Sequence, residues 1–162
     1  MPAAGINPIP DCQLTWVFGL LETLEDRGGR DDGYKIARDL QFKFGDLLKV
    51  MKTAEIFGFV STPAGDVVLE PLGRQFLEAD INQRKLMLRE LLKRHGLFAY
   101  FVRLLHGQED RSLQKEVVLE HLAMLLPNEP PERLFSTLVN WGRFAELFGY
   151  NKDDERFYLD QE

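Results

Sequence analysis

Basic side chains in the middle of the sequence are the residues of this chain best suited to binding chemistry. Five of them fall in one predicted helix: Arg84, Lys85, Arg89, Lys93 and Arg94. Lys85, Arg89 and Lys93 follow one another at intervals of four, which places them on one face of a helix. Such a stripe suits an acidic protein surface, lipid headgroups or phosphates, and its simpler interpretation is a solvated helix face. We expect these five residues to form a partner-docking stripe.

Residue types that support catalysis or metal binding are poorly placed for it. The chain has one cysteine, and its three histidines lie far apart: Cys12, His95, His106 and His121. The acidic runs at 25–32 and 153–155 lack the alternating oxygen ligands of a calcium loop. The sequence contains no Gly-x-x-x-x-Gly-Lys-Ser/Thr phosphate loop, nucleophile elbow, dinucleotide fingerprint or His-Glu-x-x-His motif. We expect no catalytic residue, no metal and no cofactor, in a protein that is not an enzyme.

The first half of the chain has the element order of a winged helix. Apolar residues recur at helical spacing over 14–27, and Gly28-Gly29 ends that helix. A short helix capped within 31–33 and a longer helix over 46–57 follow. A turn cluster at 62–66 then separates two short strands, which predicts a hairpin or wing.

The second half repeats this order and also repeats a hexapeptide. Helices over 112–125 and 131–148 precede a predicted hairpin over 150–159. The sequence Ala-Glu-Ile-Phe-Gly-Phe at 54–59 returns as Ala-Glu-Leu-Phe-Gly-Tyr at 145–150. We expect both copies to form the same corner between helix and wing, where a glycine frees the backbone to turn.

These patterns predict a mainly α protein with small β-hairpins, built from tandem winged-helix modules joined by helices. We place a leader or linker at 1–10, the first module at 11–80, connecting helices at 81–111 and the second module at 112–162. This organisation places the basic stripe on the helices that join the two modules.

Some winged helices read DNA through the last helix of the helix-turn-helix, in the major groove. The corresponding segment of the first module offers four candidate contacts: Lys43, Lys49, Lys52 and Thr53. Asp46 and Glu55 in the same segment offset much of that charge, and the whole chain has a net charge of -6. DNA binding is therefore an alternative function rather than the expected one.

The sequence favours the cytoplasm. No apolar run approaches the roughly 20 residues that span a bilayer, and the first ten residues lack the pattern of a signal peptide. We expect association with the inner face of the membrane only indirectly, through a transporter complex.

Several separated blocks resemble one known family. They are Glu-Ile-Phe-Gly-Phe at 55–59, Leu-Glu-Pro-Leu-Gly-Arg-Gln-Phe at 69–76, Ala-Asp-Ile at 79–81, and Trp-Gly-Arg-Phe-Ala-Glu-Leu-Phe-Gly-Tyr at 141–150. Together they resemble the AAA-associated C-terminal domain of ATP-binding subunits from nitrate, sulfonate and bicarbonate type ABC transporters. The resemblance implies a regulatory or docking domain behind a nucleotide-binding subunit, with no catalytic residues to carry over.

The function we expect is therefore a non-catalytic docking or regulatory domain that contacts the ATP-binding subunit of such an importer. A homodimer is a further expected arrangement. The first alternative is a winged-helix transcriptional regulator that binds DNA. The second is a sensor that holds a small ligand between its two modules.

Overall fold

A computed structural model describes residues 6–160 of the chain. The chain divides into two compact units, Cys12–Arg84 and a second unit that joins Lys85–Glu162 to the N-terminal Met1–Asp11. Of the leader predicted at 1–10, residues 1–5 lie outside the described residues, as do 161–162 of the predicted second module. Among the helices within 6–160, none combines the length and apolar character needed to cross a membrane.

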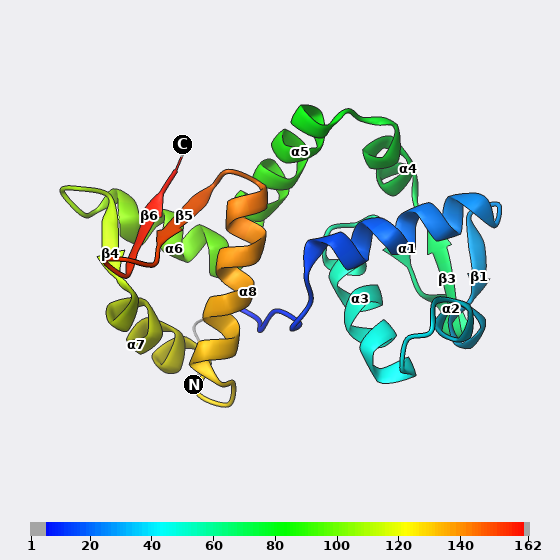
Figure 1. The fold of residues 1–162 in the computed structure, drawn as a ribbon, viewed down its shortest axis with the longest axis horizontal. Helices are drawn as coiled ribbons and strands as arrows, with labels where there is room; N and C mark the ends of the chain where they lie inside the picture. The colour runs from blue at the N-terminus through cyan, green and yellow to red at the C-terminus, as the bar shows by residue number, and fades with distance from the viewer. Residues whose placement is uncertain (1–5, 161–162) are drawn as a thin grey trace. The chain divides into compact units, whose positions relative to one another are not determined.

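The first unit has the order helix, strand, helix, helix, strand, strand, helix (Figure 1). Its elements are α1 (Leu14–Asp26), β1 (Arg30–Asp32), α2 (Gly33–Leu40), α3 (Phe44–Ile56), β2 (Val60–Ser61), the 3-10 turn η1 (Pro63–Gly65), β3 (Asp66–Leu69) and α4 (Pro71–Glu78). The three strands form one antiparallel sheet in the order β1-β3-β2. The predicted wing is therefore present, and a third strand joins it.

Helix α1 supplies one wall of this unit's core. Its buried residues recur at helical spacing: Leu14, Val17, Leu20, Leu21 and Leu24. Phe59 and Phe76 are also fully buried, with ring centroids 4.7 Å apart. Gly73 on α4 allows this packing, because a Cβ there would lie 2.4 Å from the carbonyl oxygen of Phe59. The wing and α4 thus pack backbone to backbone beside α1.

After a first helix, the second unit repeats the order helix, strand, helix, helix, strand, strand. Its elements are α5 (Ile81–Arg94), whose first turn belongs to the other unit, α6 (Gly96–His106), β4 (Ser112–Gln114), α7 (Lys115–Leu125), α8 (Pro131–Phe144), β5 (Phe148–Asn151) and β6 (Arg156–Leu159). The sheet order β4-β6-β5 matches that of the first unit. Helix α6 precedes β4 as α1 precedes β1 (Figure 1). The predicted fold class is confirmed.

Aromatic rings fill the core of the second unit. Trp141 on α8 is fully buried and stacks on Phe98 of α6, with centroids 5.8 Å apart. Phe148 lies 5.8 Å from Phe98 and 4.8 Å from Phe157. Gly142 leaves room for this cluster, because a Cβ there would lie 2.7 Å from the ring of Phe148. Burial of these large rings is the main source of cohesion in the unit.

The repeated hexapeptide occupies different structural positions in the two units. In the first, Gly58 follows the end of α3 with φ +78°, and Phe59 N donates to Ala54 O at 3.0 Å. In the second, Glu146 takes the left-handed conformation after α8, with φ 57°, and Leu147 N donates to Gly142 O at 2.9 Å. The two helix ends follow the same hydrogen-bonding pattern, typical of left-handed C-caps.

The expectation that Gly149 turns the corner as Gly58 does is therefore wrong. Gly149 lies within β5 and pairs with Tyr158 of β6. A Cβ at Gly149 would lie 2.2 Å from the outer end of the Tyr158 ring, so this ring lies over the glycine. Val60 pairs with Leu69 and Phe148 pairs with Leu159, and these are the first pairs of the two hairpins. Val60 and Phe148 are therefore structurally equivalent, although the sequence repeat aligns Phe148 with Phe57. The two hexapeptides are thus offset by three residues in the structure.

Candidate docking site

The basic stripe on α5 is largely used inside the protein. Arg89 is buried, and its Nε donates to the carbonyl oxygen of Ala145 at 3.0 Å. Its Nη2 lies 3.7 Å from a carboxylate oxygen of Glu146. A guanidinium at this position satisfies a carbonyl that the end of α8 leaves unpaired, and it faces the negative end of the helix dipole. Arg89 therefore fastens α5 to the C-terminal end of α8.

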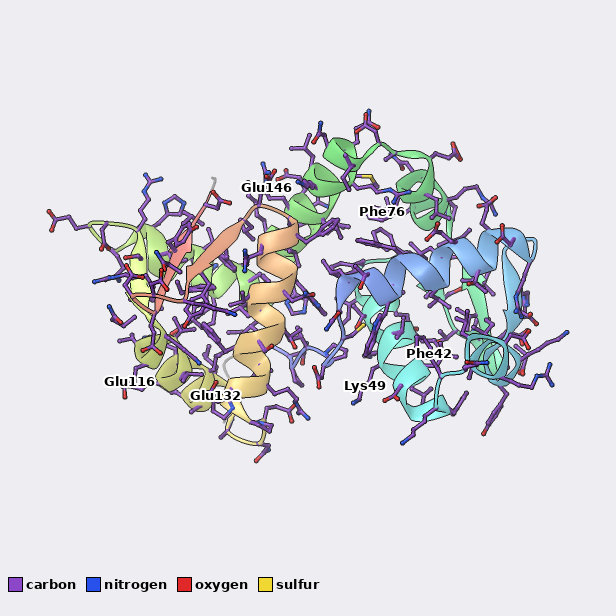
Figure 2. The ribbon with its side chains drawn as sticks, in the orientation of Figure 1. Phe42, Lys49, Phe76, Glu116, Glu132 and Glu146 are labelled. Carbon is purple, nitrogen blue, oxygen red and sulfur yellow. The ribbon has the colours of Figure 1, made fainter. Side chains whose placement is uncertain are left out.

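The neighbours of Arg89 differ in their surroundings. Lys85 Nζ lies 3.7 Å from the other carboxylate oxygen of Glu146, which Figure 2 shows where α8 ends. Lys93 Nζ lies 3.4 Å from Glu90 on the same helix, and Arg94 is exposed. The structure thus brings Lys85 and Arg89 together on one carboxylate. The sequence did not identify Glu146 as their partner. The sequence feature that singles out Glu146 is its place in the repeated hexapeptide at 145–150.

Arg84 is held within the first unit. Its Nε donates to Phe76 O at 3.0 Å, and its Nη2 donates to Leu77 O at 2.9 Å. The guanidinium carbon also lies 5.1 Å from the centre of the Phe76 ring (labelled in Figure 2). This side chain caps the carbonyl end of α4 and contributes a cation–π contact. Of the five stripe residues, Arg94 is exposed, whereas Lys85 and Lys93 are half-buried and each lies near a carboxylate.

The candidate DNA contacts around α3 are partly exposed. Lys43 takes the N-cap position of α3, and Lys43, Lys49 and Lys52 are all exposed; Lys49 is labelled in Figure 2. Thr53 is buried instead, and its hydroxyl donates to Lys49 O at 2.8 Å. Thr53 therefore does not face outward and drops out of the candidate surface. Two lysines remain on the helix that winged helices use for recognition, and a third, Lys43, remains at its N-cap.

Apolar side chains share this surface with the lysines. Tyr34 is 69% exposed and stacks on Phe44, with centroids 4.0 Å apart and planes 8° apart. Leu48, one helical turn beyond Phe44, is 46% exposed. We call Tyr34, Phe44 and Leu48 the aromatic patch. Stacking restricts the Tyr34 ring, so little conformational entropy remains to be lost when a partner covers it.

Acidic side chains near the end of α1 and in α2 form hydrogen bonds within the first unit. Arg27 bonds the carboxylates of Asp31 and Asp39, the latter at 2.6 Å. These hydrogen bonds lower the pKa of both Asp31 and Asp39 below the ordinary range. Asp32 caps α2 by accepting from Lys35 N at 3.1 Å. Within residues 6–160, no group of three or more His, Cys, Asp or Glu side chains is placed to hold a metal ion.

His95 at the start of α6 has a half-buried imidazole ring. Its Nδ1 is buried without a hydrogen-bond partner among residues 6–160, and its ring lies edge-on to Phe98 at 5.8 Å. Burial lowers the pKa of His95 below its ordinary value of 6.5 because it penalises the charged imidazolium. No nucleophile or carboxylate joins it in the hydrogen bonds of the described residues, so the imidazole has no visible catalytic partner.

Burial of His95 predicts that the folded protein is less stable at acid pH. The folded pKa lies below the unfolded one, so the unfolded chain binds the extra proton as pH falls below about 6.5. The contribution of neutral His95 is present above that pH and is lost as pH falls toward the folded pKa. The free energy of unfolding, measured by urea titration between about pH 7 and pH 5, should decrease, and His95→Phe should flatten that decrease. An unchanged slope in His95→Phe would assign the acid sensitivity to another group.

Two successive units of helix, strand, helix, helix, strand and strand define this chain as a tandem winged-helix protein. A scan of family models matches residues 34–151 to the C-terminal AAA-associated domain, from α2 to β5. That match covers most of the sequence, and the chain belongs to this family. Comparison with curated proteins finds no match, and comparison with solved structures finds none.

Proposed function

We propose that this chain is a non-catalytic accessory domain that binds the ATP-binding subunit of a nitrate, sulfonate or bicarbonate type ABC importer and regulates it by protein contact. Membership of the AAA-associated family supports an ATPase as the partner. The resemblance of the blocks at 55–59, 69–76 and 141–150 supports this transporter type. In this role the ATPase chemistry belongs to the partner, and the domain contributes a binding surface.

The observation that carries the proposal is the aromatic patch beside the recognition helix α3. A helix that reads base edges presents polar and basic side chains there, whereas buried protein interfaces are rich in aromatic rings. Tyr34 and Leu48 are two of the most exposed large apolar residues of the first unit. Their apolar area is removed from water when a protein partner covers it. This surface therefore suits a protein partner better than a nucleic acid.

The test compares binding of the purified ATP-binding subunit to the intact chain and to Tyr34→Ala/Leu48→Ser. We expect the double variant to bind at least about tenfold more weakly, because truncating a central anchor typically costs an interface more than 1 kcal/mol. Met124→Ser is the matched control, since Met124 is a 62% exposed apolar residue on α7 of the other unit. Equal affinity of the patch variant and the control, measured by titration calorimetry, would refute the patch as the docking site.

The exposed lysines of α3 favour one second candidate, binding to duplex DNA. In that case Lys43→Glu/Lys49→Glu/Lys52→Glu should abolish a gel shift that weakens steeply as salt rises. The same variant should leave binding to the ATP-binding subunit within about threefold, because the lysines flank the patch rather than form it. A gel titration at low salt in which the unaltered chain gives no retardation would eliminate this candidate.

A further inference from the structure

The outward face of α1 contains a hollow that no element of the first unit fills. Its volume is about 380 Å³, and α1 and the end of α2 with the turn after it form its walls. We call it the α1 groove. The residues that define it are Trp16, Gly19, Glu22, Asp26, Leu40 and Phe42.

Gly19 keeps the floor of the groove open. It lies in the middle of the 13-residue α1, where a helix favours alanine over glycine. A Cβ at Gly19 would meet no atom within 4 Å, so packing does not require glycine there. Its φ is not positive, so backbone conformation does not require glycine either. The absence of a side chain at Gly19 leaves space above the surface of α1.

Aromatic rings line one side of this space. Trp16 is 39% exposed, and its ring centroid lies 5.9 Å from that of Phe42, which comes from the turn before α3 (labelled in Figure 2). Leu40 completes the apolar wall. A cavity of this size lies at the small end of ligand pockets, and it matches one or two inserted side chains. Tryptophan is also one of the residue types enriched at binding hot spots.

Carboxylates form the other side of the groove. Glu22 and Asp26 stand one helical turn apart on the same face of α1, and both are exposed. Within the described residues, neither carboxylate takes part in an ion pair, and no basic residue lines the groove. An occupant that is apolar at one position and cationic beside it would match both walls. Anionic lipid headgroups and phosphates would be repelled.

We propose that the α1 groove binds a short segment of the ATP-binding subunit in which an apolar side chain is adjacent to lysine or arginine. The apolar side chain lies over Gly19 between Trp16 and Phe42. The cation contacts Glu22 and Asp26 and can lie on the exposed face of the Trp16 ring. This inference rests on the proposed function for the identity of its partner, and it assigns a site separate from the aromatic patch.

The experiment measures the affinity of the purified ATP-binding subunit for the full chain and two groove variants. Gly19→Leu fills the floor, where a Cβ meets no atom within 4 Å, and Glu22→Lys/Asp26→Lys reverses the charge of the rim. We expect each variant to weaken binding at least tenfold. Glu116→Lys/Glu120→Lys is the matched control, because these exposed glutamates have the same spacing on α7 (Glu116 in Figure 2). It should change the affinity by less than twofold.

Overlapping synthetic peptides from the ATP-binding subunit identify the bound segment. Peptides that compete with the subunit should contain lysine or arginine beside an apolar residue, and alanine at that cation should remove competition. Competition by peptides that lack a cation would overturn the proposal. Gly19→Ala supplies a folding control, since an open floor predicts a higher Tm than that of the unaltered chain. A lower Tm would show that the floor is not open.

The outcomes separate this inference from the proposed function. If the unaltered chain does not bind the subunit, the proposed function fails. If it binds and the groove variants bind as tightly, the groove inference fails and the proposed function stands. Loss of binding in the groove variants, with the α7 control unchanged, supports both.

Discussion

Replacing Arg89 with alanine should lower the free energy of unfolding of the second unit by about 2–3 kcal/mol. The change leaves the carbonyl oxygen of Ala145 without its donor and removes the packed stem of a buried side chain. The contribution of Glu146 is discounted because its side chain is 42% exposed. Urea denaturation followed by circular dichroism would measure the effect as a lower midpoint with an unchanged slope.

Lys93→Ala is the control for this prediction. Lys93 contacts Glu90 on the same helix at 3.4 Å, and Glu90 is 61% exposed, so the expected loss is about 0–1 kcal/mol. Equal destabilisation by the two variants would contradict the role of Arg89 at the end of α8. A docking test on the basic stripe should therefore reverse Lys93 and Arg94, because reversing Arg89 would disturb the fold as well.

Gly149→Ala should destabilise the second unit by about 1 kcal/mol, the low end of overpacking costs, because Tyr158 is 38% exposed and its ring can move aside. The new Cβ would overlap the Tyr158 ring, which lies 2.2 Å from its position, so the ring must leave the strand surface. Gly58→Ala should cost about 1 kcal/mol, through its positive φ rather than through overlap. Thermal denaturation of both variants would measure the two costs.

A second substitution shows whether ring overlap is the cause. Gly149→Ala/Tyr158→Ala should be less destabilised than the sum of its two single variants, because removing the ring removes the overlap. Strict additivity would contradict the overlap, and the cost of Gly149→Ala would then lie in the backbone of β5.

The winged-helix order was predictable because its signals are local. Gly28-Gly29 ends α1 within one residue of the expected position, and the turn cluster at 62–66 lies where the first hairpin turns. The strands β1 and β4 were not predicted, since each has only three residues. All three residues of β1 are charged, and β4 has a single apolar residue, Leu113, so neither gives a periodic signal. The helix expected from residue 112 begins at Lys115 instead, because Ser112 lies in β4. Pairing with a distant strand overrides local preference in such short segments.

The candidate site was harder to predict than the fold. Periodicity correctly placed Lys85, Arg89 and Lys93 on one helix, but the partner atoms on Ala145 and Glu146 lie more than 50 residues away in sequence. No local pattern reports such a contact. The hexapeptide repeat likewise identified two helix ends but gave no information about which residue ends each helix. The α1 groove was missed because it depends on an absent side chain at Gly19.

The two tryptophans give each unit its own optical reporter. Trp16 lies in the first unit and is 39% exposed, whereas Trp141 lies in the second and is fully buried. Their emission should differ in wavelength, because the exposed indole is solvated by water. Trp16→Phe and Trp141→Phe would each leave one emitting ring. Denaturation curves of the two variants would then reveal whether the two units unfold in one cooperative transition or in two independent transitions.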